Sequence, residues 1–146
     1  MEQRLQIDQL MPESWKAMYT LAGSQLKTNL SHTLRELIKI RASQINGCAY
    51  CLDMHTKDAL KYGETQQRLF LLNAWKETSL FTDEEKAVLA ITEEVTLISQ
   101  RGLSEATYQN ARKYFDEETI AQIIMAVVTI NAWNRIAISS LTQVPQ

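Results

Sequence analysis

The sequence predicts an all-α fold, a single-domain bundle of about six to seven helices that spans residues 1–146. Apolar residues recur every three or four positions along most of the chain, as on the buried face of amphipathic helices. Residues that cap helix N-termini and glycines that end helices separate these stretches. No segment shows the strict alternation of apolar and polar residues that indicates a half-buried strand. A chain of this length can bury a sufficient core without a disulfide or a metal.

Three helices are expected in the first part of the chain. Pro12 stands where a proline is favoured, at the first position of a helix. Ser31 can cap the second helix, and a third begins at or near Cys48. These helices are followed or closed by Gly23, Gly47 and Gly63. Glycine can adopt the left-handed conformation in which many helices end. The predicted helices cover residues 12–23, 31–46 and 48–62.

Two further helices are expected in the middle of the chain. Thr65 can cap a helix that carries Leu69, Leu72 and Trp75 on one face. The segment TDEE at residues 82–85 is a capping box, in which the first and last side chains bond each other's backbone N–H groups. An apolar stripe follows this box and continues to Gly102, which predicts one helix over residues 82–102.

The last part of the chain predicts a short helix capped by Ser104 and a long one that begins at Asp116. The long helix contains about 25 residues and would span about 37 Å. A compact domain of this size seldom hides a helix of that length alone. We therefore expect part of it to meet another subunit.

The composition excludes several classes of partner. The chain carries 15 basic and 17 acidic residues, mixed along its length, and has a net charge of −2. It offers no basic face for nucleic acid. The longest apolar run, residues 123–130, is too short to cross a bilayer, and the segment MEQRLQIDQL lacks the apolar region of a secretory signal. We therefore expect a cytoplasmic protein with no nucleic-acid or membrane partner.

The stretch GCAYCLDMH, residues 47–55, holds the two cysteines of the chain. In a reducing compartment a CxxC pair is more often catalytic or metal-binding than structural. Cys48, Cys51 and His55 would share one stripe of a helix, at its N-terminal turn. The imidazole of His55, one turn from Cys51, could take the thiol proton. Cys48 in the first turn would be stabilised as a thiolate by unpaired N–H groups.

Glu36 could complete this site from the preceding helix. The turn at Asn46 and Gly47 predicts that the two helices run antiparallel. His55 lies about 12 Å beyond the turn and Glu36 about 15 Å before it, so the carboxylate could hold the imidazole in a proton relay. The spacing also allows a simpler interpretation, a solvated ion pair between Glu36 and Lys39.

Other interpretations of the polar residues remain open at this point. Free cysteines are readily buried, so the pair could be core packing. A structural zinc site requires four ligands, and the chain offers only His55 and the distant His32 beside the cysteines. We therefore expect no metal. A third cluster, Asn131, Trp133, Asn134 and Arg135, suggests a buried polar network or an interface rather than a catalytic set.

The motif Glu36-(x)11-Cys48-x-x-Cys51-x-x-x-His55 closely resembles the signature of the alkylhydroperoxidase D-like (AhpD-like) branch of the carboxymuconolactone decarboxylase family. The segment INAWNRI, residues 130–136, resembles a second characteristic stretch, so the resemblance spans about residues 12–141. One departure is Tyr50, where the branch's namesake has histidine. The family's lactone decarboxylases lack the CxxC pair, so the two cysteines favour the redox branch.

The resemblance implies that Glu36 and His55 form the relay, that Cys51 is the activated sulfur and that Cys48 closes the disulfide. It also implies an all-helical fold that assembles as homo-trimers or hexamers. We therefore predict a thiol-dependent peroxidase that reduces alkyl hydroperoxides, takes electrons from an external lipoyl or thioredoxin-like dithiol, and needs no cofactor. Which cysteine reacts first stays open, because a helix terminus favours Cys48 as the exposed sulfur.

Three alternatives to this function remain. A redox-responsive adaptor that exchanges thiols would oxidise once without peroxide turnover. A lactone decarboxylase would keep its activity after loss of both cysteines. A zinc-binding helical module would hold about one equivalent of metal per chain.

Overall fold

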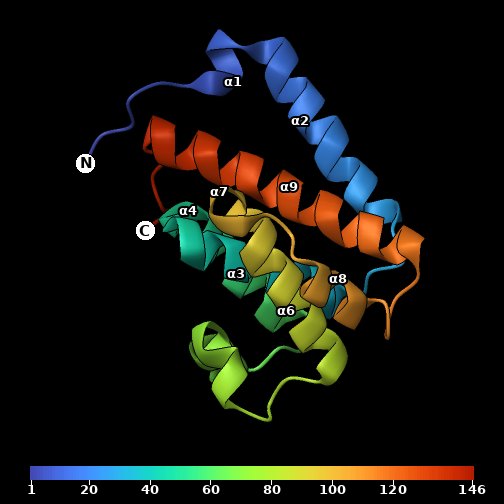
Figure 1. Ribbon diagram of the computed structural model, residues 1–146. Coiled ribbons are helices and arrows are strands. Elements are labelled where there is room, and N and C mark those ends of the chain that lie inside the picture. Colours follow the sequence, from blue (N-terminus) through green and yellow to red (C-terminus); the bar gives the residue numbers. More distant parts are fainter.

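The longest element of the fold is a helix of 24 residues that lies across the others (Figure 1). The computed structural model describes residues 1–146, with nine α-helices, two 3₁₀ helices and no strand, which confirms the all-α prediction. The elements in chain order are α1 (Ile7–Leu10), α2 (Pro12–Ser24), η1 (Gln25–Lys27), α3 (His32–Asn46), α4 (Ala49–Lys61), α5 (Gln66–Leu71), η2 (Leu72–Glu77), α6 (Asp83–Thr96), α7 (Ile98–Arg101), α8 (Glu105–Ala111) and α9 (Glu117–Ser140).

Local signals set most of the helix boundaries. At five N-termini a side-chain oxygen accepts a backbone N–H bond from three residues on, and at α6 the capping box is complete. The capping side chains belong to Ser31, Thr65, Thr82, Ser104 and Asp116. These caps satisfy N–H groups that have no partner inside the helix. The predicted starts of these five helices are therefore confirmed.

Two predicted helices are interrupted. The stripe expected to form one helix up to Gly102 breaks at Leu97, which has φ −94° and ψ 40° and separates α6 from the one-turn α7. Trp75 lies in η2 rather than in α5, and Ala74 within η2 has non-helical angles. Apolar spacing indicates which side chains face the core, and a short break can keep those side chains buried. Periodicity therefore located both segments without detecting the breaks.

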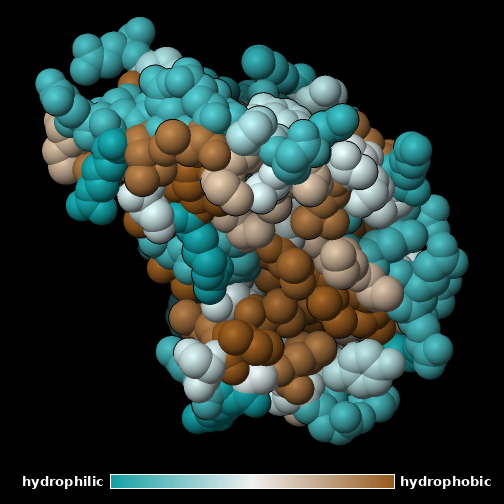
Figure 2. Space-filling view, turned by 90° about the horizontal axis from the view of Figure 1, so that it is seen from above, coloured by the Kyte–Doolittle hydropathy of each residue, from teal (hydrophilic) through white to brown (hydrophobic).

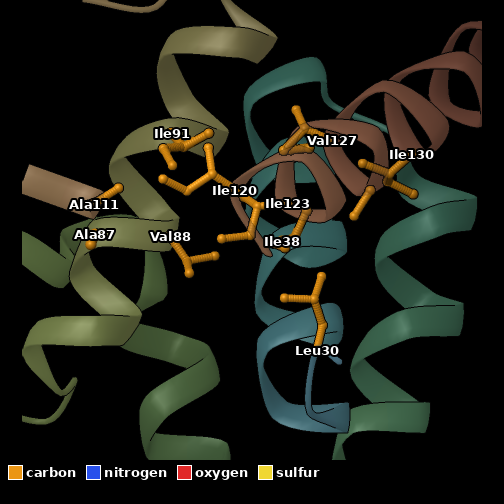
Figure 3. Packing of buried hydrophobic residues seen from close by; sticks show 12 residues of the cluster. Leu30, Ile38, Ala87, Val88, Ile91, Ala111, Ile120, Ile123, Val127 and Ile130 are labelled. Atoms are coloured by element: carbon orange, nitrogen blue, oxygen red, sulfur yellow. The ribbon is translucent and has the colours of Figure 1, made fainter. Parts of the chain in front are cut away.

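The core forms around α3, which packs against α4, α6 and α9. Figure 3 shows Ile38 of α3 together with Val88 and Ile91 of α6 and Ile123 and Val127 of α9, and each of the five is fully buried. A second apolar cluster joins α3 and α6 to the α5–η2 segment and includes residues 37, 40, 69, 72, 75 and 89. The two clusters fix the position of α3 from both sides.

A buried amide network joins α3 to α9. The Asn46 side-chain NH₂ donates to the Oδ1 atoms of Asn131 and Asn134, both at 2.9 Å. Asn134 in turn donates to the Ser43 hydroxyl at 3.0 Å, and Asn131 donates to the Thr96 hydroxyl at 3.0 Å. The expectation of a buried polar network is confirmed for Asn131 and Asn134, whereas Trp133 belongs to an aromatic cluster instead. Because each amide satisfies its neighbour, the network also fixes the axial register of the two helices.

The N-terminal segment, α1 and α2, lies on the outer side of α9, opposite α3, α4 and α6 (Figure 1). No residue of α2 is fully buried. Trp15 and Tyr19 of α2 meet Trp133 of α9 edge-to-face, with ring centroids 5.2 and 5.6 Å away. Such aromatic pairs add to the energy of area burial. The face that carries α1, α2 and α9 shows broad apolar areas (Figure 2).

By length and composition alone, α9 is apolar enough to cross a membrane. Buried positions make up 44% of its most apolar window. Its contacts with α3 and α6 explain this composition, because a helix surrounded by others is apolar on most sides.

Candidate active site

The two cysteines sit where α3 ends and α4 begins. Gly47 follows α3 with φ 71°, the left-handed conformation that reverses the chain. Cys48 is the N-cap residue of α4 rather than a residue of its first turn, and its Sγ accepts the Cys51 backbone N–H at 3.3 Å. The two residues form a disulfide, with Cα atoms 5.3 Å apart. One helical turn therefore brings the sulfurs into bonding range without long-range rearrangement.

The two sulfurs differ in access. Cys48 is 0% exposed and packs beneath Ala137 of α9, whereas Cys51 is 4% exposed and lines the main cavity. The expectation that a helix terminus leaves Cys48 as the exposed sulfur is wrong, because α9 covers this terminus. Cys51 is the sulfur that a molecule in the cavity can reach.

Glu36 of α3 and His55 of α4 face each other across the helix pair. Glu36 Oε2 and His55 Nδ1 lie 3.3 Å apart, a charge contact without hydrogen-bond geometry, and neither atom has a hydrogen-bond partner elsewhere. The remaining oxygen, Oε1, accepts a hydrogen bond from Lys39 Nζ at 2.8 Å. The predicted Glu36–Lys39 ion pair thus exists, but Glu36 is only 6% exposed, so it is not the solvated pair that the spacing allowed. The contact at Nδ1 leaves His55 Nε2, across the ring, free for proton exchange.

The charge on Glu36 is stabilised locally. Burial raises the pKa of this carboxyl, but the contact with His55 and the hydrogen bond and charge of Lys39 outweigh burial and bring the pKa below its usual 4.5. Glu36 is therefore ionised near neutral pH. A buried carboxylate beside an imidazole can hold the ring in one orientation, as in other relays that activate a nucleophile.

A cavity of about 310 Å³ opens onto this site between α2, α3, α4 and α9. Its wall is mostly apolar, and its members are Trp15, Tyr19, Ala22, Gln25, Leu26, Arg35, Lys39, Tyr50, Cys51, Met54, His55, Ala126, Thr129, Ile130, Trp133, Ile136, Ala137 and Thr142. The volume lies at the lower end of the range for small-molecule sites. A small apolar molecule in it would meet both Cys51 and His55.

Sequence reasoning did not identify most of the cavity wall. Trp15 and Tyr19 come from α2, Trp133 from α9, and Arg35 from the helix that carries Glu36. The available signal was the four-residue spacing of Trp15 and Tyr19, which places them on one helix face. Tyr50, found where the related motif has histidine, lines the same cavity.

The remaining candidates lie apart from the cavity. His32 stacks on Tyr62, with ring centroids 3.7 Å apart, at an exposed position. The structure brings together no group of three or more His, Cys, Asp or Glu side chains that could hold a metal ion. The zinc alternative therefore has no ligand set here.

Comparison with known proteins places the chain among relatives of the same architecture. The carboxymuconolactone decarboxylase family matches residues 11–94, more than half of the chain. The uncharacterized protein YdfG of Bacillus subtilis (strain 168) is 42% identical over 139 residues, which cover 95% of each chain.

Solved structures show the same fold. A crystal structure of a protein of unknown function from Agrobacterium tumefaciens, suggested to be the antioxidant defence protein AhpD, is 36% identical, covers 99% of each chain and superimposes with a TM-score of 0.96. The debrominase Bmp8, solved with 2,3,4-tribromopyrrole, is 16% identical, with a TM-score of 0.82 over 92% of this chain and 72% of its own. At that identity the likeness concerns the fold alone.

Proposed function

The chain belongs to the AhpD-like branch of the carboxymuconolactone decarboxylase family, and from this premise we propose that it is a thiol-dependent peroxidase that reduces organic hydroperoxides. The observation that carries the proposal is the position of Cys51. Its sulfur is the accessible member of a bonded CxxC pair, and it lines an apolar cavity beside the Glu36–His55 contact. The antioxidant role suggested for the Agrobacterium relative supports the same chemistry.

The proposed cycle starts from the reduced pair. His55 Nε2 takes the Cys51 thiol proton, and the thiolate attacks the outer peroxide oxygen, so that the O–O bond breaks and Cys51 becomes a sulfenic acid. The imidazolium returns the proton to the departing alkoxide, which leaves as an alcohol. The Cys48 thiol then displaces the sulfenic hydroxyl, and the hydroxyl leaves with the thiol proton as water.

An external dithiol closes the cycle by reducing the disulfide in two exchange steps. The attack of the donor falls on the accessible Cys51 sulfur, and Cys48 is the leaving thiolate. The N–H of Cys51, which points at Cys48 Sγ, stabilises that leaving group. The overall reaction converts one hydroperoxide and one dithiol into an alcohol, water and a disulfide. The chemistry uses no metal or flavin.

A steady-state assay tests this function. Loss of cumene hydroperoxide is followed with dithiothreitol, dihydrolipoamide or reduced thioredoxin as the donor, for the wild type and for Cys51→Ser. The expected result is many turnovers with at least one donor and none in Cys51→Ser. A single oxidation that then stops would identify the redox-responsive adaptor instead. Conversion of a lactone that survives loss of both cysteines would identify a decarboxylase.

We further propose that one domain over residues 1–146 assembles as a homo-oligomer in the cytoplasm. The apolar side chains of Met125, Val128 and Ile138 on α9 are each about two-fifths exposed. Apolar side chains that gather in an exposed patch mark protein–protein contacts, and the exposure of these three side chains supports the proposed assembly. Sedimentation velocity of the purified protein tests for trimers or hexamers, and a monomer at micromolar concentration would contradict assembly.

A further inference from the structure

One end of the cavity carries positive charge that the protein itself leaves unpaired. Arg35 and Lys39, one turn apart on α3, both line the cavity, and no aspartate or glutamate is among the lining residues. Lys39 is neutralised by Glu36 at 2.8 Å. Arg35 forms no ion pair, and its guanidinium donates only one hydrogen bond within the protein, a 3.4 Å contact with the Gln25 backbone carbonyl. Four of its five N–H donors therefore remain available.

Arg35 is not a freely solvated surface arginine. It is partly buried, and the cavity around it is mostly apolar. Polar groups in such places are normally satisfied, and a guanidinium without a carboxylate partner retains its capacity for a planar, bidentate anion. The unused donors therefore point to a ligand with an anionic group.

The antiparallel pair α3–α4 sets the order of these groups along the cavity. Cys51 and His55 are one turn apart on α4, and His55 contacts Glu36 on α3. Arg35 adjoins Glu36 and lies one turn before Lys39, farther from the α3–α4 turn that carries the disulfide. One helical turn is about 5.4 Å, so the Cα atoms of Arg35 and Cys51 lie roughly two turns apart along the helix axes. A ligand that reaches both must span several carbon atoms.

The wall between the two ends suits a hydrocarbon or aromatic body. Trp15, Tyr19 and Trp133 pack edge-to-face, and Met54 adds a flexible thioether to the wall. Aromatic rings and methionine adapt to apolar ligands of irregular shape. The cavity thus has a reactive sulfur at one end, an apolar middle and a cation at the other end.

We propose that the cavity binds amphipathic carboxylates with their anionic head at Arg35. Taken with the proposed function, on which this step rests, the hydroperoxide reduced at Cys51 is an organic acid whose peroxide group stands several carbons from its carboxylate. Hydroperoxides of fatty acids and of arylalkyl acids share this chemistry. A neutral hydroperoxide would still reach Cys51, but it would leave Arg35 without a partner.

The peroxidase assay distinguishes charge recognition from apolar burial. A hydroperoxy acid is compared with its methyl ester, which has the same chain and peroxide group but no charge. A hydrogen bond to a charged group is worth a factor of roughly 10 or more, so the wild type should favour the acid by at least about 10-fold in kcat/KM. Arg35→Gln should reduce this ratio to near one, and Arg35→Lys should keep part of it.

Lys113→Gln is the matched control, because it removes one positive charge from an exposed residue outside the cavity. It should retain the full preference for the acid. Equal rates on acid and ester in the wild type would overturn the proposal, and so would a preference that survives in Arg35→Gln. A rise in KM for the dithiol donor instead of the hydroperoxide in Arg35→Gln would also overturn it, because Arg35 would then serve the reductant.

A binding measurement separates this inference from the proposed function. In Cys51→Ser/Trp75→Phe, the fluorescence of the two remaining tryptophans, Trp15 and Trp133, is titrated with decanoate and with methyl decanoate, neither of which is a peroxide. Decanoate should bind about 10-fold more tightly, and Arg35→Gln in the same background should abolish the difference. If this result holds while peroxidase turnover is absent, the carboxylate site stands and the peroxidase function fails. If turnover occurs and both ligands bind equally, the carboxylate site fails and the peroxidase function stands.

Discussion

Replacing Glu36 with glutamine tests whether the carboxylate acts through His55. The change keeps the size of the side chain and leaves an oxygen that can still face Nδ1, but it removes the charge 3.3 Å from the imidazole. Oε2 has no polar partner except His55, so the lost interaction is specific to the ring. If this charged contact is worth about 2 kcal/mol, its loss corresponds to roughly 30-fold in kcat/KM. Removing the base itself, in His55→Ala, should cost roughly 100-fold.

The double variant measures the coupling between these two residues. A neutral hydroperoxide with a saturating dithiol donor restricts the assay to the step at Cys51. If Glu36 acts only through the imidazole, Glu36→Gln combined with His55→Ala should be about as slow as His55→Ala alone. Losses that multiply, to roughly 3,000-fold, would refute the relay, because each residue would then act independently. Unchanged turnover in His55→Ala would remove the base from the mechanism.

Glu93, which is partly buried, provides a control for the loss of a paired carboxylate. Its Oε1 accepts the Trp75 indole N–H at 2.7 Å and pairs with Arg41 at 3.0 Å, outside the cavity. Burial raises the pKa of Glu93, and hydrogen bonds from Trp75 and Lys76 with the nearby Arg41 charge outweigh it, so this pKa is also low. Glu93→Gln should lower the urea midpoint and leave turnover unchanged. Slowed turnover in this variant would mean that the effect at Glu36 is general destabilisation.

Three further predictions follow from the burial and charge of particular groups. A sulfenic-acid probe should label Cys48→Ser strongly after one equivalent of peroxide, and labelling only in Cys51→Ser would reverse the roles of the sulfurs. Asn134→Ala removes the amide that donates to the Ser43 hydroxyl and one of the two acceptors of the Asn46 side-chain NH₂, so urea unfolding should show a loss of about 1–3 kcal/mol, and a loss below about 0.5 kcal/mol would contradict the network. The pKa of Glu36 in the folded protein lies below its usual value of 4.5. The charge on Glu36 therefore stabilises the fold above pH 4.5, and this stabilisation is lost as the pH falls through the folded-state pKa. The stability advantage of the wild type over Glu36→Gln should therefore be largest near neutral pH and shrink below pH 4.5, and a gap that stays constant down to pH 3 would contradict this linkage.

The parts of the site that depend on neighbouring turns were predictable from the sequence. The cap at Ser31 and the glycine at 47 define where α3 begins and ends, and the 15-residue helix between them fixes how far Glu36 lies from the turn. The number of residues between Gly47 and His55 likewise places His55 opposite Glu36. Helical rise is nearly constant, so this antiparallel register could be calculated without any knowledge of the rest of the fold.

The burial of Cys48 could not be predicted in this way. Its exposure depends on Ala137, which is 89 residues away and lies on a helix whose position is set by the amide network and by the core shared with α3 and α6. The N-terminus of an isolated helix is accessible to solvent. A cysteine at such a terminus is favoured as the reactive sulfur only when no other element covers it. Packing of α9 covers this terminus and leaves access at Cys51.

The reactive groups of the candidate site come from neighbouring turns of one helix pair, whereas most of the cavity wall comes from distant helices. The α3–α4 hairpin alone supplies the bonded sulfurs, the imidazole and the carboxylate, so its own sequence determines how a peroxide bond would be broken. The wall of the cavity comes largely from α2 and α9, which meet through Trp15 and Trp133. Since α2 buries no residue fully, its side chains can change with little cost to the core. Under the proposals made above, the α3–α4 hairpin would carry out the reaction, and α2 together with Arg35 of α3 would select the molecules that reach it.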